Sequence, residues 1–396
     1  MIKREIEEKF QTLANTRKVV MITGARQIGK STFVKEMKEK NRTYVTLDDL
    51  SLRELAKSDP KLFLMNYKGP VIIDEVQYAP NLFPYIKLDV DNSNEVGKYW
   101  LTGSQKFELM KNVTESLAGR VSILEMSSLS YAEKKGFKSK IFNPNDIKNN
   151  FTVTPEEIYK GGMPEYINNN LDRNQFFNDY ITTYLERDVR NLANVGDLLS
   201  FRKFMIAVAS RNGEVLNYNS ICEDADIDNK TAKKWISILE ANDIIYLLQP
   251  YFSSQLKRVT KSPKIIFMDT GLCSFLCNWN SGNNLMNSTT SGHYLETFVI
   301  SELIKNKRNS KDSLNYDIYF YRDKDGKEID LIINFDNTIY PFEIKKTANP
   351  KLEMIKNFNI LEKTNLNVGN GGLICFYPDI LPLDEKNKAY PISSIF

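Results

Sequence analysis

The sequence predicts an α/β protein that begins with a parallel sheet, continues through a helical middle and ends in a second α/β unit. Three observations support this fold class. Strand-like apolar runs alternate with helical segments in the first third, helical spacing prevails in the middle, and two alternating runs flank a two-residue turn near the end. We expect four units, at residues 1–133, 134–196, 197–277 and 278–396.

The first unit contains five strand-like runs separated by helical segments. This alternation is typical of parallel strands joined by helices that cover both faces of the sheet. We expect strands at Val19–Thr23, Thr43–Leu47, Val71–Ile73, Tyr99–Thr102 and Val121–Met126.

A glycine-rich motif follows the first predicted strand and fits G-x-x-x-x-G-K-[ST] between a strand and a helix. Backbone N–H groups of such a loop point at phosphate oxygens, and the next helix presents its positive end. We therefore expect ATP or GTP binding, with Lys30 at the β- and γ-phosphates and Ser31 on Mg²⁺. A chance glycine-rich turn is the alternative. The predicted binding residues are Gly24, Ala25, Arg26, Gln27, Ile28, Gly29, Lys30, Ser31 and Thr32.

Polar side chains follow the third and fourth predicted strands. Asp74 and Glu75 come directly after an apolar run, at the sheet edge where open α/β folds bind ligands. Asp74 is placed to hold Mg²⁺, and Glu75 to orient and deprotonate the attacking water. A strand-end acidic pair that caps a helix is the alternative. Ser104, after the next strand, is a candidate sensor of the γ-phosphate.

Arg120 immediately precedes the fifth predicted strand. A guanidinium there can project off the surface into a neighbour's nucleotide site, where an arginine finger raises the rate about 10³–10⁵-fold. This role requires several copies of the chain, so we expect a homo-oligomer. An ion pair within the chain is the alternative.

Composition excludes several classes of protein. No run among the 396 residues approaches the roughly 18 apolar residues of a membrane span, and the charged N-terminus lacks a signal-peptide core. We expect a cytoplasmic protein without membrane contact. The four cysteines lack C-x-x-C spacing and His293 is the single histidine, which argues against a zinc site or disulfide framework. The net charge of +3 is too small to argue nucleic-acid binding by itself.

The second unit is predicted to be a helical lid and linker. A polar stretch at Lys134–Asn150 marks the boundary, and Gly161-Gly162-Met163-Pro164 is typical of a turn. Apolar residues recur at helical spacing from Phe176 to Leu192, which predicts a packed helix.

The third unit predicts a winged helix-turn-helix. Helical segments at Phe201–Arg211, Tyr218–Ala225 and Lys230–Asn242 precede an extended run at Ile244–Leu248. The third helix places lysines where a recognition helix meets DNA phosphates, and further cations follow along the wing. Solvated lysines, or a winged helix that contacts protein, are the alternatives. These cations are Lys230, Lys233, Lys234, Lys257, Arg258, Lys261 and Lys264.

Near the end, Glu328–Phe335 and Thr338–Lys345 alternate in polarity around Asp336-Asn337, which predicts a β-hairpin. Facing residue numbers then sum to 673, so Asp330 lies opposite Glu343. Alternation places the charged residues of the hairpin on one face and its apolar residues on the other. The charged residues are Glu328, Asp330, Glu343 and Lys345. The apolar residues are Ile329, Leu331, Ile333, Tyr340, Phe342 and Ile344.

Facing carboxylates stand only ~5 Å apart at Cβ and should repel. A divalent cation between Asp330 and Glu343, Mg²⁺ or Mn²⁺, would remove the repulsion, and Lys345 could stabilise an activated water or phosphate. The alternative is a solvated face on which Glu328 pairs with Lys345.

Several motifs together resemble a known family. The runs Thr46-Leu47-Asp48-Asp49, Ile73 to Pro80 and Leu101-Thr102-Gly103-Ser104 are similar to the prokaryotic AAA+ ATPases called AAA_14, which usually carry a C-terminal DUF4143 domain. The resemblance implies a P-loop AAA+ fold with a lid, ATP as nucleotide, and Walker B and sensor roles for Asp74, Glu75 and Ser104. Arg120 lies where AAA+ proteins commonly carry the finger, so the resemblance favours that role over the ion pair. Candidates for the lid's arginine sensor are Arg187 and Arg190. The alternative is that both are ordinary charged residues on the surface of a helix.

The C-terminal unit resembles the PD-(D/E)xK nuclease fold. Asp330 with Glu343-Ile344-Lys345 fits its D…E-x-K pattern, and Glu296 supplies the additional acid from an upstream helix. The resemblance implies a metal site but leaves cleavage open. We therefore expect Mg²⁺-dependent ATP hydrolysis coupled to DNA engagement, with metal-dependent phosphodiester cleavage as one use of the C-terminal unit. The alternative is a nucleotide-driven switch whose nuclease-like domain binds a protein partner and cuts nothing.

Overall fold

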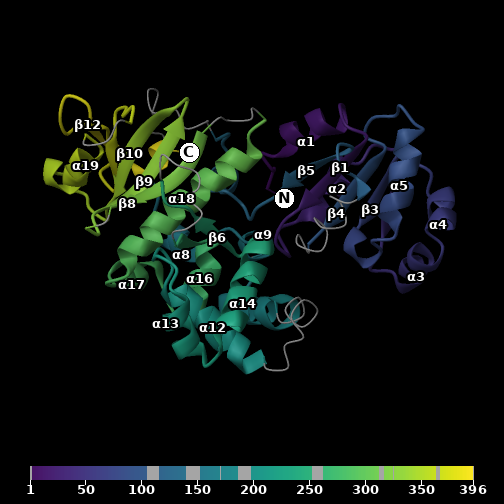
Figure 1. Ribbon diagram of the computed structural model, residues 1–396, viewed down its shortest axis with the longest axis horizontal. Helices are drawn as coiled ribbons and strands as arrows, with labels where there is room; N and C mark the ends of the chain where they lie inside the picture. Colours follow the sequence, from purple (N-terminus) through teal and green to yellow (C-terminus); the bar gives the residue numbers. More distant parts are fainter. Residues whose placement is uncertain are drawn as a thin grey trace.

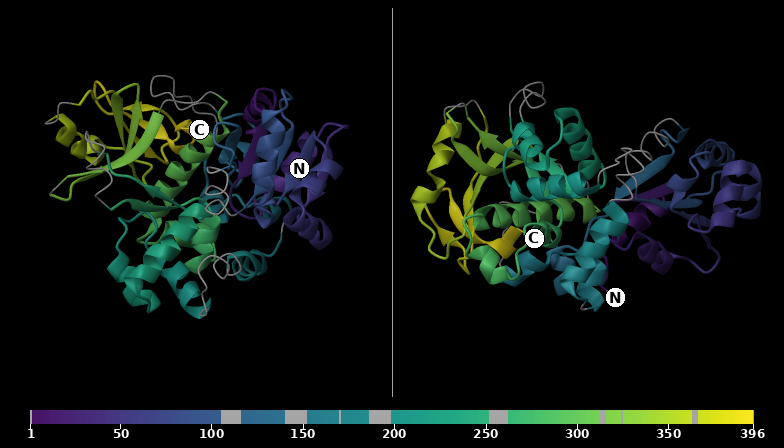
Figure 2. Two further views of the ribbon diagram at one scale, coloured as in Figure 1. Left: turned by 45° about the vertical axis from the view of Figure 1, so that its right-hand side comes forward. Right: turned by 90° about the horizontal axis from the view of Figure 1, so that it is seen from below.

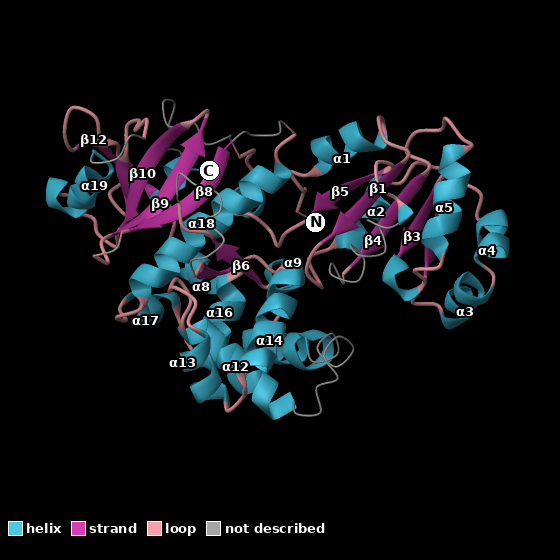
Figure 3. Cartoon of the chain, in the orientation of Figure 1, coloured by secondary structure: helices cyan, strands magenta, loops and turns pink. Residues whose placement is uncertain are grey.

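The computed structural model describes residues 2–104, 116–139, 152–169, 171–185, 198–251, 262–311, 316–323, 325–362 and 366–395. Its two large sheets lie on opposite sides of the molecule, with the middle helices below and between them (Figures 1 and 3). Helix α18, Ser291–Asn309, runs from the C-terminal sheet toward the N-terminal one (Figure 2). Over the described ranges, the search for a helix that combines the length and apolarity of a membrane span finds none.

The N-terminal sheet contains five parallel strands in the order β2-β3-β4-β1-β5, and its predicted strand runs are confirmed. Strands β1, β3 and β4 are buried along their whole length, because helices cover both faces. The order places β4 between β1 and β3, so the ends of these three strands meet at one edge. The strands are β1 Val19–Thr23, β2 Thr43–Thr46, β3 Val71–Asp74, β4 Tyr99–Gly103 and β5 Val121–Glu125.

Alternate residues of β1 enter two different cores. Val20 and Ile22 pack with Phe10 and Phe33, from the helices α1 and α2. Val19 and Met21 belong to the core on the other face, which includes residues of α3, α4 and α5. The elements are α1 Glu7–Ala14, α2 Lys30–Met37, α3 Leu50–Ser58, α4 Pro60–Asn66, the 3₁₀-helix η1 Val76–Tyr78 and α5 Leu82–Asp91.

The middle segment is mainly helical, as predicted. The described part of the predicted helix at 176–192 consists of α10, Arg173–Asp179, and a π-helical turn η2, Tyr180–Leu185. The three helices and the extended run of the third unit are α12, α13, α14 and β6, and β6 pairs with β7 as an antiparallel ribbon. The other bounds are α7 Tyr131–Lys135, α8 Pro155–Lys160, α9 Pro164–Asn169, α12 Leu198–Ser210, α13 Tyr218–Ala225, α14 Asn229–Ala241, β6 Ile245–Leu248, β7 Lys264–Phe267, α16 Thr270–Leu276 and α17 Gly282–Met286.

The C-terminal sheet has six strands in the order β12-β13-β11-β10-β9-β8. Its central hairpin follows the predicted register, from Thr338 opposite Phe335 to Phe342 opposite Leu331. The two turn residues both have positive φ, near +49° and +57°, which suits the two-residue hairpin loop. The bounds are β8 Tyr316–Arg322, β9 Glu328–Phe335, β10 Thr338–Ile344, η3 Leu352–Phe358, α19 Asn359–Glu362, β11 Gly372–Cys375, β12 Leu381–Pro382, β13 Lys388–Pro391 and η4 Ile392–Ile395.

The predicted faces of this hairpin need a correction at β9. Pairing with β8 shifts between Tyr319 and Tyr321, so that Asp330 and Leu331 together face Phe320. This is the geometry of a β-bulge, which interrupts the alternation of side chains. Ile329 therefore packs on a different core from that of the other predicted apolar residues. Those residues, which remain together, are Leu331, Ile333, Tyr340, Phe342 and Ile344.

One continuous apolar core links the predicted units. It includes Phe10 from the N-terminal sheet layer, Phe204 from α12, Phe298 from α18 and Phe342 from β10. The sheets are therefore joined through packed side chains, chiefly around α18.

Candidate functional site

The predicted phosphate-binding loop joins β1 to α2 and requires both of its glycines. Gly24 has φ +146°, and a Cβ there would lie 2.1 Å from the Met126 carbonyl oxygen. Gly29 has φ +89° and directly precedes the first residue of α2. These positions let the loop turn tightly against β5 and point the helix N-terminus at the sheet edge.

Lys30 is buried at the start of α2. Its Nζ donates to the carbonyl oxygens of Gly24 and Ala25, at 3.0 and 2.6 Å. The ammonium thus lies over the loop whose N–H groups were predicted to hold phosphate.

Asp74, buried at the end of β3, is surrounded by hydroxyl groups. Ser31 Oγ donates to its Oδ1 at 3.0 Å, Tyr44 OH donates to its Oδ2 at 2.6 Å, and Thr102 Oγ1 also contacts Oδ1. Burial, then the hydrogen bond to Asp74, raises the pKa of Tyr44. The predicted pair of Ser31 and Asp74 is brought together. No sequence motif pointed to Tyr44 or Thr102, which lie on β2 and β4, the two strands that pair with β3.

Glu75 adopts a left-handed backbone conformation with φ +56°, which is costly for a residue other than glycine. Its N–H donates to Thr102 Oγ1 at 3.2 Å. The Gln77 amide contacts Glu75 Oε2 and donates to Ser104 Oγ at 3.3 Å. Glu75 and Ser104 therefore meet as predicted, through a glutamine that the sequence interpretation did not select.

A cavity of about 540 Å³ opens beside the loop. Its wall includes Gly29, Lys30 and Glu75 from the sheet edge, and Asn168 and Asn169 from the end of α9. The predicted lid segment therefore does reach the predicted nucleotide site.

Arg4 also borders this cavity and fastens the loop to the rest of the chain. It donates to the carbonyl oxygens of Ile28 and Ser127, at 2.8 and 2.6 Å, and to Glu133 Oε1 at 3.0 Å. No motif pointed to Arg4. Its role depends on segments far apart in sequence.

Arg120 forms an ion pair within the chain. Its Nε and Nη2 donate to the two carboxylate oxygens of Asp91, at 2.5 and 3.0 Å. The guanidinium remains about one-third exposed, and the finger role stays a prediction. Arg187 and Arg190 lie outside the described residues.

The three lysines of the predicted recognition helix, Lys230, Lys233 and Lys234, are exposed on α14. Lys233 also lines a groove of about 550 Å³, and Arg322 from β8 is another of its lining residues. The groove further includes Val215 to Asn219, Asn229 and Ser262. The cations predicted at 257, 258 and 261 lie outside the described residues.

The expectation for Lys264 was wrong. It is 2% exposed and does not extend along a surface wing. Its Nζ lies 2.5 Å from Glu296 Oε1 and also contacts Glu328 Oε1. The sequence interpretation failed here because Glu296 and Glu328 come from distant elements, α18 and β9.

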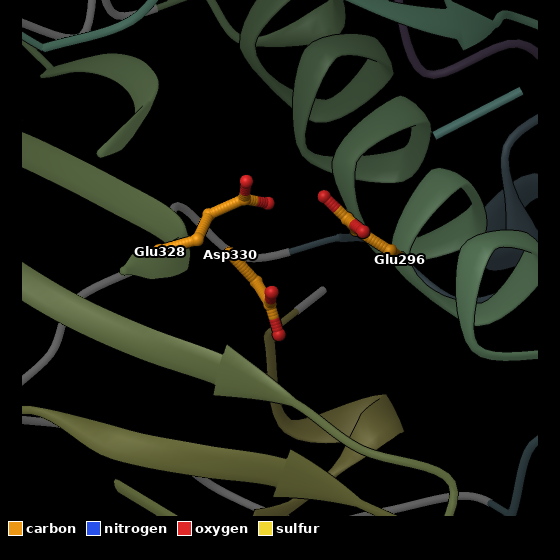
Figure 4. A group of neighbouring side chains, drawn as sticks. All are labelled: Glu296, Glu328 and Asp330. Carbon is orange, nitrogen blue, oxygen red and sulfur yellow. The ribbon is translucent and has the colours of Figure 1, made fainter. Parts of the chain in front are cut away.

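Glu296, Glu328 and Asp330 form a cluster at the bulge of β9, with ligand oxygens all within 4.8 Å of one another (Figure 4). On the β10 side, Lys345 Nζ lies 2.7 Å from both Asp330 Oδ2 and Glu343 Oε2. The predicted group of Glu296, Asp330, Glu343 and Lys345 therefore assembles. The alternative pair of Glu328 with Lys345 does not form, because each side chain has a different partner. We call this group the carboxylate cluster. It consists of Glu296, Glu328, Asp330, Glu343, Lys264 and Lys345.

Burial dominates the electrostatics of the carboxylate cluster. It raises the pKa of Glu296 to about 7, against the opposing effect of Lys264. Burial, then the Asp330 charge, raises the pKa of Glu343 to about 9. Burial by itself would raise the pKa of Asp330, but Lys345 and Lys264 bring it below its ordinary value. Of Glu296, Asp330 and Glu343, Asp330 is thus the one whose surroundings favour the charged form.

Comparison with known families agrees with the geometry of the loop. Residues 16–134 match a family model described as an AAA domain, AAA_14. This part of the chain is therefore similar to an AAA domain. Residues 291–395 match a domain of unknown function, DUF4143, so both expected family matches are confirmed. Residues 152–283 match another domain of unknown function, DUF8612, which spans most of the predicted lid and winged helix.

Relatives of this chain occur in bacteria and archaea. An uncharacterized protein of Mycobacterium tuberculosis is 27% identical over 354 residues, covering 88% of this chain and 75% of that protein. One of Methanocaldococcus jannaschii is 23% identical over 360 residues, covering 80% and 74%. Among solved structures, a Walker-type ATPase of Pyrococcus abyssi has 15% identity and a TM-score of 0.44, covering 69% of this chain and 94% of that one.

Proposed function

We propose that the AAA-type domain hydrolyses ATP with Mg²⁺ and that hydrolysis is coupled to engagement of DNA by the middle segment. The observation that carries the first part is that Lys30, Ser31 and Glu75 line one cavity. Behind them, Asp74 accepts a hydrogen bond from Ser31, and Ser104 donates one to Glu75. Phosphoryl transfer needs a phosphate cradle, a metal position and a group that orients water, and this edge holds residues suited to all three.

The residues at this edge fit Mg²⁺. Ser31 Oγ and Asp74 Oδ1 lie 3.0 Å apart, and both are the oxygen donors that Mg²⁺ prefers. Ser31 and Asp74 would hold the ion, which when bound neutralises charge that develops on the phosphates. Lys30 contributes a second positive charge, and Glu75 accepts the proton of the attacking water. Gln77 and Ser104 orient the Glu75 carboxylate.

The test compares Lys30→Ala with Lys38→Ala, an exposed lysine directly after the same helix. We expect Lys30→Ala to lower ATP turnover by roughly 100-fold or more, since it removes a charge that stabilises the transition state. Lys38→Ala should retain normal turnover. Unchanged turnover in Lys30→Ala would contradict the site assignment.

DNA engagement is supported by the groove that Lys233 and Arg322 line. These two exposed cations would provide phosphate contacts that position a nucleic acid, and Lys230 and Lys234 extend the basic surface along α14. Binding should therefore weaken with salt, and each phosphate that the protein neutralises should contribute about −0.9 to the slope of log affinity against log salt concentration.

Fluorescence anisotropy of a labelled duplex tests this part. Replacing the three α14 lysines together by alanine should weaken binding and reduce the salt slope, whereas a control triple variant of distant exposed lysines should bind normally. Salt-independent binding, or equal loss in both triples, would contradict the DNA proposal. The control lysines are Lys351, Lys356 and Lys386.

The carboxylate cluster supports metal-dependent phosphodiester cleavage as the activity of the C-terminal unit. Its oxygen donors suit Mg²⁺ or Mn²⁺, and Asp330 with Lys345 would place charge near a phosphate. Wild type and Glu343→Ala are compared on plasmid and linear DNA in Mn²⁺, with ATPase turnover measured in parallel. Cleavage that does not depend on Glu343 would contradict this part.

The second candidate function is a non-catalytic switch. It is favoured by the ion pairs of Lys264 with Glu296 and Glu328, and it predicts no cleavage by the wild type or by Glu343→Ala.

A further inference from the structure

Lys264 belongs to the middle segment, but its ammonium lies inside the carboxylate cluster of the C-terminal unit. Its Nζ contacts Glu296 and Glu328, and the Phe320 ring centre is 5.3 Å away. The Lys264 side chain is 3% exposed. One segment of the chain therefore supplies a buried cation to carboxylates that two other elements provide.

The backbone fixes where this ammonium can reach. Lys264 begins β7, pairs with Leu248 of β6 and forms a bridge with Val215. The next two residues of β7, Ile265 and Ile266, are fully buried. Because the strand is held on both sides, the ammonium leaves the carboxylates only if β7 shifts or the side chain changes its conformation.

Two of the carboxylates that Lys264 contacts are also ones that a divalent cation would need. Glu296, Glu328 and Asp330 each offer one oxygen within 4.8 Å of the others. A metal ion bound among them would lie within a few ångströms of the Lys264 Nζ, where like charges repel strongly because burial limits screening. The Lys264 ammonium and a metal ion would therefore compete for these carboxylates.

A second observation shows that the cluster has acceptor capacity beyond its two lysines. Glu343 Oε1 is buried and has no hydrogen-bond partner among the described residues, although Glu343 Oε2 contacts Lys345. The cluster therefore keeps a buried oxygen that a further positive charge could contact.

We propose that Lys264 is the resident cation of the carboxylate cluster and excludes divalent metal ions from it until the ammonium is withdrawn. The inference rests on the proposed cation site of the C-terminal unit. It makes Lys264 the residue by which the middle segment controls that site, and cleavage would require a state in which its ammonium has left the carboxylates.

Manganese binding to the full-length protein without nucleotide or DNA tests the proposal. Calorimetry and electron paramagnetic resonance should show that Lys264→Met gains one Mn²⁺ site at least roughly 100-fold tighter than any the wild type has in the cluster. The double variant Lys264→Met/Glu328→Gln should lose the gained site. The matched control is Lys305→Met, which removes another buried lysine, paired with Glu302 on α18 at 2.9 Å, and should gain none.

Thermal melting supplies a second readout that does not depend on activity. In EDTA, Lys264→Met should melt below the wild type because its carboxylates have lost their cation, and Mn²⁺ should restore much of the difference. Wild-type melting should change little with Mn²⁺. If Lys264→Met does not fold in EDTA, it is refolded in Mn²⁺, and the melting temperatures of Lys264→Gln with and without Mn²⁺ are compared instead.

Two results would overturn the proposal. Either the wild type binds Mn²⁺ as tightly as Lys264→Met and loses the ion in Glu328→Gln, or the folded Lys264→Met protein gains no site. Failure of the nuclease proposal is distinguishable, because a Lys264→Met protein that gains Mn²⁺ but cuts no DNA contradicts cleavage alone.

Discussion

Replacing Arg308 by methionine should destabilise the protein by about 3–5 kcal/mol, the cost of leaving a buried charge without its partner. Arg308 lies near the end of α18 and donates to both carboxylate oxygens of Asp243, at 2.7 and 2.8 Å. It also donates to Ser127 Oγ at 2.7 Å and lies 3.2 Å from Glu125. The Asp243 side chain is 10% exposed, so solvent cannot replace the missing guanidinium. Arg308→Lys should lower the free energy of unfolding by less, since it keeps the positive charge and loses only the bidentate hydrogen bonds to Asp243.

The magnitude is checked by calorimetry on the single variants and on Arg308→Met/Asp243→Asn. Removing both charges leaves no unpaired group, so the double variant should be more stable than the sum of the single costs predicts by about 1–3 kcal/mol. Lys307→Met, which removes the adjacent half-exposed cation, is the control and should cost under about 1 kcal/mol. An Arg308→Met cost under about 1 kcal/mol, or strictly additive costs, would refute this account of the contact.

Three further results are expected. Gln77→Leu should lower kcat about tenfold with little change in KM, because it removes a hydrogen bond to the Glu75 carboxylate, and steady-state kinetics would reveal an unchanged kcat as the contrary result. In EDTA, the melting temperature should fall as pH rises from about 4.5 toward 9. The pKa of Glu343 is raised to about 9 in the folded state, so over this range the folded protein binds more protons than the unfolded chain. Glu343→Gln should flatten this dependence of the melting temperature on pH. If Arg120 acts between subunits, Arg120→Ala should lower ATP turnover and mixing it with Glu75→Gln should restore part of it, whereas Asp91→Ala, which removes the internal partner of Arg120, should leave turnover largely intact.

Local sequence patterns predicted the fold well where neighbouring residues decide the structure. The parallel strands of the N-terminal sheet were predictable because each is a short apolar run next to a helical segment. The C-terminal hairpin followed the predicted register because a two-residue turn leaves little freedom in pairing. The pairing of Ser31 with Asp74 followed from the adjacency that parallel strands impose at a sheet edge.

The errors arose where strands paired with elements that the local pattern could not include. The bulge at Asp330 depends on pairing between β9 and β8, and it moves Ile329 to the opposite core from Leu331. Lys264 was assigned to a solvated wing because its partners on α18 and β9 lie 32 and 64 residues further along the chain. Gln77 carries no motif of its own, and its role becomes visible only from the contacts of its amide group.

Helix α18 connects the two candidate sites by direct contacts at both of its ends. Glu296 lies in its first half, in the carboxylate cluster, and Arg308 lies 12 residues later, about 18 Å along the axis. Arg308 donates to Ser127 Oγ, and the Ser127 carbonyl accepts from Arg4, which also holds the Ile28 carbonyl of the phosphate-binding loop. Because a packed 19-residue helix moves as a unit, a displacement of the loop has a contact route to the cluster through these arginines. Arg308→Lys, the milder variant, should therefore weaken any effect of ATP on Mn²⁺ binding at the cluster while leaving basal ATP turnover intact. An unchanged ATP effect would exclude this route.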